Sequence, residues 1–334
     1  MKICNRCILP ETFPGIHFDA AGICNHCTRE APALAKAGER KEAYRRRLDD
    51  LIAGVRGSAP TYDAILAYSG GKDSSYTLKL LRDRYDLRIL ALTFDNHFIS
   101  PAAAENIRTV TDRLLVDCVT FKPPWPILRD LFASAALEDV FPAPTLIRAS
   151  AICTACISMV KSLVLKTALE MSIPLVAFGW SPGQAPIQSA IMRASSSLTC
   201  QSQKTLLEGL PGGLASGLGR YFLPDGYYEI FKDRFPHNVH PLAFFDYDEA
   251  EIVAELGKVG WKTPADTDTN SSNCLLNAFA NQCHLQRHQF HPYVWEIANM
   301  VRQGVMSRDE GIQKIYTDQD PAQVGYARTM LGLQ

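Results

Sequence analysis

The sequence has no excess of charge of either sign, since 34 lysine and arginine residues balance 35 aspartate and glutamate residues. A surface that holds a nucleic-acid backbone usually carries a strong positive field, so this balance favours small-molecule partners, although a local basic patch would suffice for tRNA. The sequence also lacks an apolar run long enough to span a bilayer, and its first residues lack the apolar core of a signal peptide. We therefore expect a cytoplasmic protein with no membrane partner.

Cysteine, by contrast, is abundant, with 10 residues. In a cytoplasmic chain this number indicates metal or redox chemistry rather than disulfides. Two pairs, Cys4-x2-Cys7 and Cys24-x2-Cys27, lie sixteen residues apart near the start of the sequence. Four thiolates at such a spacing can surround a tetrahedral Zn²⁺. So short a segment buries too little apolar surface to fold without a metal ion or another cross-link. The pattern predicts a structural zinc ribbon over residues 1–30; an iron–sulfur cluster and four unliganded core thiols are the alternatives.

Strand and helix signals alternate through the middle of the chain. Apolar runs predict strands at 63–68, 88–94, 116–121 and 173–178, and helical periodicity predicts helices at 74–84, 101–114, 125–137 and 154–171. This alternation favours an α/β fold: a Rossmann-like, doubly wound parallel sheet covered on both faces. We expect four regions, which are the ribbon over 1–30, a linker helix over 31–58, a nucleotide-binding domain over 59–250 and a C-terminal helical region over 251–334.

The second half of the chain gives weaker signals. Residues 180–235 are rich in Ser, Gly and Pro and predict a long excursion with short helices. A last strand or turn is expected at 240–242, an amphipathic helix at 247–257, and helices from residue 271 onward. Arg148 and Arg193 are candidates for binding a substrate phosphate or carboxylate, with surface solvation as the alternative.

Further cysteines and histidines have no strong pattern. Cys118 and Cys200 stand alone and are expected to be structural. His284 and His288 have the i, i+4 spacing of a metal site, with Cys283 and His291 nearby, but no acidic residue follows the first histidine. A packed or solvated helix face is the favoured interpretation.

The segment Ser69-Gly70-Gly71-Lys72-Asp73-Ser74 joins a predicted strand to a predicted helix. Two glycines allow successive N–H groups to point into one hollow, the helix N-terminus adds a partial positive charge, and Lys72 adds a full one. The spacing is not that of a Walker A loop. The segment predicts a binding site for a phosphate chain, and a plain structural turn is the alternative.

This segment resembles the SGGKDS PP-loop of the N-type ATP pyrophosphatases, in the adenine nucleotide alpha hydrolase superfamily. The resemblance implies that ATP is cleaved to AMP and pyrophosphate while a carbonyl or carboxylate oxygen is adenylated. It implies that the six loop residues contact the phosphates, that Lys72 neutralises the leaving pyrophosphate and that Asp73 positions Mg²⁺. Phe94 and Asp95, at the end of the second predicted strand, are expected to flank the adenosine. By the same analogy, Gly179 and Gln184 face the α-phosphate or the activated substrate.

A second group of cysteines follows the loop. Cys153 and Cys156 open a predicted helix, and Cys274 lies far along the chain in Ser272-Asn273-Cys274. A helix N-terminus lowers thiol pKa values, so thiolates are expected here. The arrangement resembles that of iron–sulfur tRNA thiolation enzymes of the same superfamily, which implies that these three cysteines hold a [4Fe-4S] cluster whose fourth iron binds hydrosulfide. A persulfide resolved by a second cysteine, or three small apolar side chains in a core, are the alternatives.

The N-terminal stretch carries a third resemblance. Residues 4–12, 14–19 and 22–24 resemble the start of bacterial N-acetyl sugar amidotransferases, and this likeness extends over residues 1–95. Those enzymes use ATP, and ammonia from a glutaminase partner, to convert an acetamido group to an acetamidino group. The segments at 93–98 and 179–184 depart from that family.

These observations lead to one principal prediction and two alternatives. We predict adenylation of a carbonyl oxygen followed by its replacement with sulfur, on a nucleobase, a tRNA or a small-molecule amide, with a separate sulfur donor as partner. The alternatives are ammonia-dependent amidination and a non-catalytic nucleotide-binding module. A homodimer is compatible with each of them.

Overall fold

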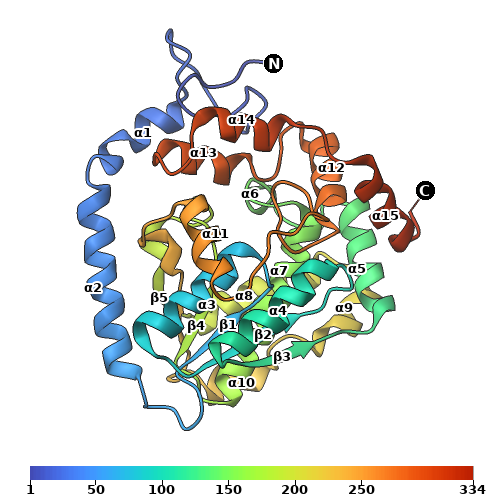
Figure 1. The fold of residues 1–334 in the computed structure, drawn as a ribbon. Helices are drawn as coiled ribbons and strands as arrows, with labels where there is room; N and C mark the ends of the chain where they lie inside the picture. The colour runs from blue at the N-terminus through green and yellow to red at the C-terminus, as the bar shows by residue number, and fades with distance from the viewer. Residues whose placement is uncertain (334) are drawn as a thin grey trace.

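The computed structural model describes residues 1–333, and its centre is one six-stranded sheet with the strand order β3-β2-β1-β4-β6-β5 (Figure 1). The strands are β1 (Ala64–Ala67), β2 (Ile89–Phe94), β3 (Asp117–Phe121), β4 (Leu175–Phe178), β5 (Ile191–Arg193) and β6 (His237–Val239). All neighbours pair in parallel except β5, which runs antiparallel to β6 at one edge. The predicted α/β fold is confirmed, and the expectation of a wholly parallel sheet is corrected by β5, whose three residues are too few to show a periodic signal.

Fifteen α-helices occupy the described residues. They are α1 (Asn25–Leu34), α2 (Ala37–Val55), α3 (Lys72–Tyr85), α4 (Pro101–Leu114), α5 (Trp125–Leu137), α6 (Ala143–Leu146), α7 (Ala151–Glu170), α8 (Ser196–Glu208), α9 (Gly212–Gly219), α10 (Asp225–Ile230), α11 (Glu249–Gly257), α12 (Asn277–His288), α13 (Val294–Arg302), α14 (Arg308–Tyr316) and α15 (Pro321–Leu331). Two short 3-10 helices lie at Ile187–Ser189 and Pro241–Ala243.

Alternate residues of each strand face opposite layers of helices. In β1, Ala64 and Leu66 pack in one apolar cluster with residues of α2, α3, α4 and α11, whereas Ile65 packs in another with residues of α7. This alternation follows from the two-residue period of a strand. The sheet is therefore covered on both faces, as the sequence predicts.

The structure corrects two predicted boundaries and decides between two alternatives at a third. The linker helix divides into α1 and α2 because the chain leaves helical geometry at Lys36, where φ is −109° and ψ is 17°. Of the strand or turn expected at 240–242, the structure has the turn, as the 3-10 helix Pro241–Ala243, and the last strand, β6, ends before it at Val239. Residues 271–276 are not helical, since they are held by hydrogen bonds to the segment that follows β2, and α12 begins only at Asn277.

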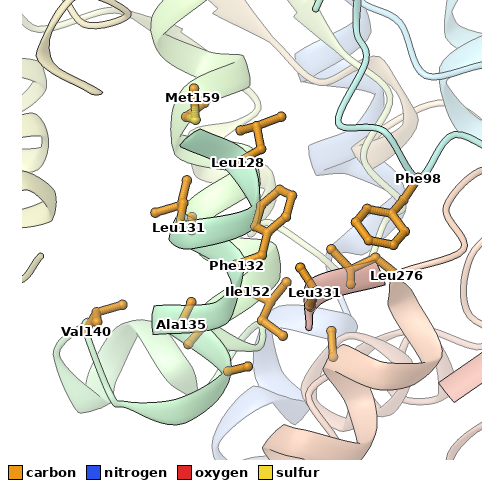
Figure 2. Packing of buried hydrophobic residues seen from close by; sticks show 14 of the residues in the cluster. Phe98, Leu128, Leu131, Phe132, Ala135, Val140, Ile152, Met159, Leu276 and Leu331 are labelled. Carbon is orange, nitrogen blue, oxygen red and sulfur yellow. The ribbon is translucent and has the colours of Figure 1, made fainter. Parts of the chain in front are cut away.

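The C-terminal helices share a core with the helices that cover the sheet. Figure 2 shows Leu276 and Leu331 packed close to Phe98 and Phe132, in a cluster that also includes Ile152 of α7. All five side chains are almost completely buried. The cluster fixes α12 and α15 against α5 and α7, next to the carboxyl ends of the strands.

The N-terminal cysteine module packs on α13 and α14, which lie beside it in Figure 1. The Arg308 guanidinium donates hydrogen bonds to the carbonyl oxygens of Cys4 and Cys7, and the Tyr316 hydroxyl donates to the carbonyl of Ile8. The module is thus attached to two C-terminal helices by polar contacts as well as by an apolar cluster.

Helix α7 is long and apolar enough in composition to cross a membrane, although no such segment was expected. Half of that stretch is buried inside the protein, where it packs on the sheet and on α5. A core helix of a globular protein meets the same criteria, so the finding is weak evidence for a membrane span.

Candidate active site

The carboxyl ends of β1, β2 and β4 meet at one edge of the sheet because the three strands are adjacent and parallel. The loop at 69–74 follows β1, and its second half forms the start of α3. Gly179, which follows β4, lies so close to this helix that an added Cβ would stand 2.4 Å from the Cα of Ser74. The absence of a side chain at Gly179 therefore allows the two strand ends to approach, whatever else this residue contacts.

Backbone geometry at the loop requires glycine at residue 70. Gly70 has a φ of +74°, and an added Cβ would lie 2.5 Å from the carbonyl oxygen of Ala103. The indole N–H of Trp261 donates to the Gly70 carbonyl at 2.9 Å. The two serines close the loop on itself, since the Ser69 N–H donates to the Ser74 hydroxyl and that hydroxyl donates to the Gly71 carbonyl.

Charged groups from three helices surround the loop lysine. The Lys72 ammonium lies 3.1 Å from the Glu249 carboxylate of α11 and 3.7 Å from the carboxylate of Asp73. Asp73 accepts a hydrogen bond of 2.8 Å from the Tyr247 hydroxyl, and burial raises the pKa of Asp73. Lys314 of α14 lies 3.6 Å from Glu249. A phosphate chain entering the loop would therefore compete with carboxylates for the charge of Lys72.

The nonhelical segment 271–276 lies against the loop. The Lys72 backbone N–H donates to the Ser272 hydroxyl at 2.9 Å, and Ser272 would also be 2.8 Å from a Cβ on Gly71. Two residues later, Cys274 forms an isolated bridge with Ile99, in the segment that follows β2. One short stretch of chain thus contacts the loop at 69–74 and carries the third cysteine.

The three internal cysteines converge around two asparagines. The Asn96 amide donates to the sulfurs of Cys274, at 3.5 Å, and Cys156, at 3.8 Å. The Cys153 thiol donates to the Asn277 Oδ1 at 3.7 Å. These contacts bring together the residues that the sequence singled out, although their sulfurs are not packed within 4.8 Å of one another as a group.

Both asparagines are themselves held in position. Asn96 is 7% exposed, and its Oδ1 accepts from the backbone N–H of Phe98. Asn277 donates to Asp268 at 2.7 Å and accepts from the Tyr293 hydroxyl at 3.0 Å. Neither asparagine was identified as a site residue from the sequence. The available signals were the position of Asn96 just after β2 and that of Asn277 three residues after Cys274.

The expectation of low thiol pKa values is wrong for the free thiols. Burial raises the pKa of Cys153 to about 12, and it also raises the pKa values of Cys156 and Cys274. The helix N-terminus is already capped by the Ser150 side chain, which accepts from the Cys153 N–H at 3.1 Å. No cationic side chain offsets the cost of a buried thiolate here, so a bound metal group would have to supply the positive charge.

Glu296 of α13 is a site residue that the sequence did not indicate. Its carboxylate accepts a hydrogen bond of 2.6 Å from the Ser181 hydroxyl in the loop after β4. Burial, together with the charge of Asp73, raises the pKa of Glu296 to about 7. In the same loop, Gln184 accepts from the Ser181 N–H at 2.9 Å. A carboxyl group with a pKa near neutrality can take or give a proton under physiological conditions.

Glu296 also lines a cavity of about 1000 Å³ beside the strand ends. The cavity lies between α7 and α8 and reaches Gln184, Cys153, Arg148 and Arg193. The Arg193 guanidinium donates to the carbonyl oxygens of Phe235 and Asp233. These hydrogen bonds connect two parts of the segment 180–235. The cavity is large enough for a small-molecule substrate.

The remaining predicted residues fall into two groups. Phe94 ends β2, is almost buried and belongs to the apolar cluster against which Cys153, Cys156 and Cys274 pack, and the neighbouring Asp95 accepts from the His97 N–H and pairs with Lys122 at 2.8 Å. His284 is 3% exposed, and burial lowers its pKa to about 3. Neither ring nitrogen of His284 has a hydrogen-bond partner within the described chain, and no metal-ligand group there includes it. The histidines therefore belong to a packed helix face.

The four N-terminal cysteines form a compact cluster. All four are buried, and their sulfurs lie within 4.8 Å of one another. The sulfurs of Cys4 and Cys27 are 3.9 Å apart, and those of Cys7 and Cys24 are 3.8 Å apart. This donor set can hold a metal ion.

Comparisons with known proteins give little functional information. No family model matches the chain. The chain is similar to Uncharacterized protein MJ1599 of Methanocaldococcus jannaschii, with 21% identity over 322 residues, which is 96% of this chain and 95% of the relative. That relative carries no assigned activity, so the similarity transfers none.

Two solved structures show weak likeness. The U34-tRNA thiolase NcsA from Methanococcus maripaludis, with its [4Fe-4S] cluster, is 14% identical, with a TM-score of 0.35, and the match covers 91% of this chain and 87% of the thiolase. A predicted subunit of tRNA methyltransferase from Methanocaldococcus jannaschii is 17% identical, with a TM-score of 0.25, over 55% of this chain and 91% of that one. TM-scores this low carry no argument about fold or activity.

Proposed function

We propose that this protein is an ATP-dependent enzyme of the PP-loop type that adenylates a carbonyl oxygen and then replaces that oxygen with sulfur. The observation that carries the proposal is the contact of the phosphate loop with the segment 271–276. Ser272 touches the loop, and Cys274 stands with Cys153 and Cys156 around Asn96 and Asn277. This contact supports the proposal because it connects the loop assigned to activation with the group of three thiols.

In the activation half, the loop residues bind ATP. The N–H groups at the start of α3 and the Lys72 ammonium would hold the β- and γ-phosphates, and Asp73 would help to position Mg²⁺. The carbonyl oxygen of the acceptor attacks the α-phosphorus, and pyrophosphate leaves. For an amide acceptor, Glu296 is placed to accept the N–H proton that the acceptor loses as its oxygen becomes adenylated.

In the replacement half, hydrosulfide attacks the activated carbon, and AMP leaves with the original oxygen. The three thiols fit a [4Fe-4S] cluster in number and chemistry, because cysteine thiolates are its usual ligands and all three pack against an apolar cluster. When bound with three cysteines, such a cluster supplies an iron without a protein ligand, where hydrosulfide can be held. The Asn96 amide is oriented to stabilise sulfur at Cys156 and Cys274.

The N-terminal cluster is proposed to hold structural zinc. A tetrahedral Zn²⁺ with Zn–S bonds of about 2.3 Å separates its sulfurs by about 3.8 Å. The Cys4–Cys27 and Cys7–Cys24 separations of 3.9 Å and 3.8 Å match that value. The larger spacing that a four-iron cluster imposes on its ligands does not fit a set contained within 4.8 Å.

Anaerobic purification with iron, sulfide and zinc assays tests both metal assignments. We expect a brown protein that contains a four-iron cluster and one zinc per chain, and that loses iron but keeps zinc in Cys274→Ala. Pyrophosphate release that depends on both ATP and an acceptor tests the activation half. A colourless, iron-free protein with full activity in Cys274→Ala would refute the cluster, and activity with ammonia in place of sulfide would favour amidination.

A further inference from the structure

The cavity beside the candidate active site is positively charged, although the whole chain carries a net charge of −1. Its lining includes Lys161, Arg148 and Arg193 but only one carboxylate, that of Glu296. Because Glu296 has a pKa near neutrality, even this negative charge is incomplete at physiological pH. The cavity therefore attracts anions.

Lys161 is the cation best placed to hold one. It lies on α7 deep in the protein, yet its side chain is exposed because it faces the cavity. Its ammonium lies 4.6 Å from the ring centroid of Trp180, which in turn stacks on His240 with the ring centroids 4.3 Å apart. No carboxylate of the described chain pairs with Lys161, and the surrounding protein lowers its pKa. An ammonium that faces an aromatic ring but no carboxylate keeps N–H donors free for an anionic ligand in the cavity.

One face of α7 lines the cavity from the cysteine to the lysine. Cys153, Thr154, Ser158, Lys161 and Ser162 all line the cavity. Eight residues of helix separate Cys153 from Lys161, which corresponds to about 12 Å along the axis. A ligand that reaches from the reactive end of the cavity to Lys161 is therefore of nucleotide or sugar-phosphate size.

The cations of the lining suit a phosphate. A phosphate can be contacted by more than one cation, and neither Lys161 nor Arg148 has a carboxylate partner in the described chain. The fork of Arg193, by contrast, is already used by backbone carbonyls. We propose that this cavity binds a phosphorylated small molecule, with its phosphate at Lys161 and its reactive carbonyl near Glu296 and Cys153. That this ligand is the acceptor of the reaction rests on the proposed function, whereas the phosphate site itself does not.

Pyridoxine 5′-phosphate and pyridoxine are suitable probes, because they differ only in the phosphate. Formaldehyde with cyanoborohydride methylates lysines, and peptide mapping locates each product. We expect pyridoxine 5′-phosphate to slow the methylation of Lys161 at least 10-fold, after the rate is divided by that at Lys204, an exposed lysine of α8 that does not line the cavity, whereas pyridoxine should not slow it. Lys161→Met confirms which peptide carries the methyl groups.

Protection experiments complete the test. ATP should not protect Lys161 from methylation. Equal protection of Lys161 by pyridoxine, or no protection by pyridoxine 5′-phosphate, would overturn the proposal. Protection by ATP would assign the cavity to the nucleotide, and protection by bulk tRNA alone would assign it to a polynucleotide. Labelling requires neither turnover nor a cluster, so this test and those of the proposed function can fail separately.

Discussion

The Lys72 backbone N–H donates to the Ser272 hydroxyl at 2.9 Å, across 200 residues of sequence. This hydrogen bond joins the start of α3 to the segment that carries Cys274. The N–H groups at this helix start are the ones that a phosphate would use, and the Ser272 hydroxyl keeps its own proton free to donate. The phosphate loop and the cysteine group are therefore not independent sites, and a change in one is expected to affect the other.

Ser272→Ala should weaken ATP binding about 5-fold, which corresponds to the loss of one hydrogen bond worth about 1 kcal/mol. The reason is that the loop loses a contact that orders it and a donor that can face the phosphates. Calorimetric titration with a non-hydrolysable ATP analogue measures the change without an acceptor. Unchanged affinity would show that Ser272 has no part in the phosphate site.

Ser271→Ala is the matched comparison for that variant. The Ser271 hydroxyl accepts hydrogen bonds from the N–H groups of Asn273 and Cys274, and it makes no contact with the loop. We expect this variant to reduce iron content under anaerobic conditions while ATP affinity stays within about 2-fold of wild type. The two variants would thus distinguish the effect of the segment 271–276 on ATP binding from its effect on iron binding.

The fold was predictable where the signal is local. The strands β1, β2, β3 and β4, and the helices α3, α4, α5 and α7, follow from continuous apolar runs and helical periodicity, which depend on residues close in sequence. The loop at 69–74 was recognisable for the same reason, since its six residues are contiguous. Strand β5 was missed because three residues cannot establish a period.

The missed parts of the site depend on tertiary contacts. Glu296, Asn96 and Lys161 become part of a site only because α13, the turn after β2 and α7 meet near the strand ends. A carboxyl pKa near 7 depends on burial by residues far away in the sequence, so no local pattern indicates it. The thiol pKa values were mispredicted for a related reason: burial outweighs the effect of the helix terminus.

Lys72→Met should lower ATP affinity about 10-fold to 100-fold, since charged hydrogen bonds are worth about 1.5–3 kcal/mol. Lys72 carries the one positive side-chain charge of the six loop residues, and methionine preserves its apolar stem. Lys79→Met, on the same helix, is the control because its ion pairs are with Asp83 and Glu255, away from the loop. Equal affinities in the two variants would contradict the assignment of the phosphate site.

Glu296→Gln should raise the melting temperature at pH 8 but not at pH 4.5. Burial raises the folded-state pKa of Glu296 from 4.5 to about 7, so the wild-type protein holds an unfavourable buried charge above that pH. At pH 4.5 the folded-state carboxyl is neutral and the unfolded-state carboxyl is half ionised, so the difference almost disappears. Thermal unfolding at several pH values, with exposed Glu208→Gln as the control, measures the effect. A melting temperature that changes equally at all pH values would rule out a raised pKa.

Removal of the N-terminal metal should loosen the active site as well as the ribbon. Arg308 and the apolar cluster connect the cysteine module to α13 and α14, and α13 carries Glu296 and the Asn299 amide that donates to the Gly183 carbonyl. Cys4→Ser is expected to cost about 4 kcal/mol or more of folding free energy and to abolish zinc binding. Hydrogen exchange should accelerate in α13 and α14 before it does in β1 and β2. Cys118→Ser, on the exposed strand β3, should leave zinc content and exchange unchanged.

Asn96→Asp should abolish iron retention, whereas Asn96→Ala should only reduce it. The Asn96 amide donates to the sulfurs of Cys156 and Cys274, and such donation favours sulfur that carries negative charge. Alanine removes two weak hydrogen bonds, but aspartate places a negative charge beside two cysteine sulfurs in a buried site, where repulsion is strong. Anaerobic iron and sulfide assays with absorbance spectra measure retention, and zinc content reports whether the chain is folded. If the cysteines instead serve as apolar core residues, neither variant changes bound iron, since there is none. If both variants retain a full complement of iron, the asparagine does not contact the cluster ligands, and the arrangement of the three thiols proposed above is wrong.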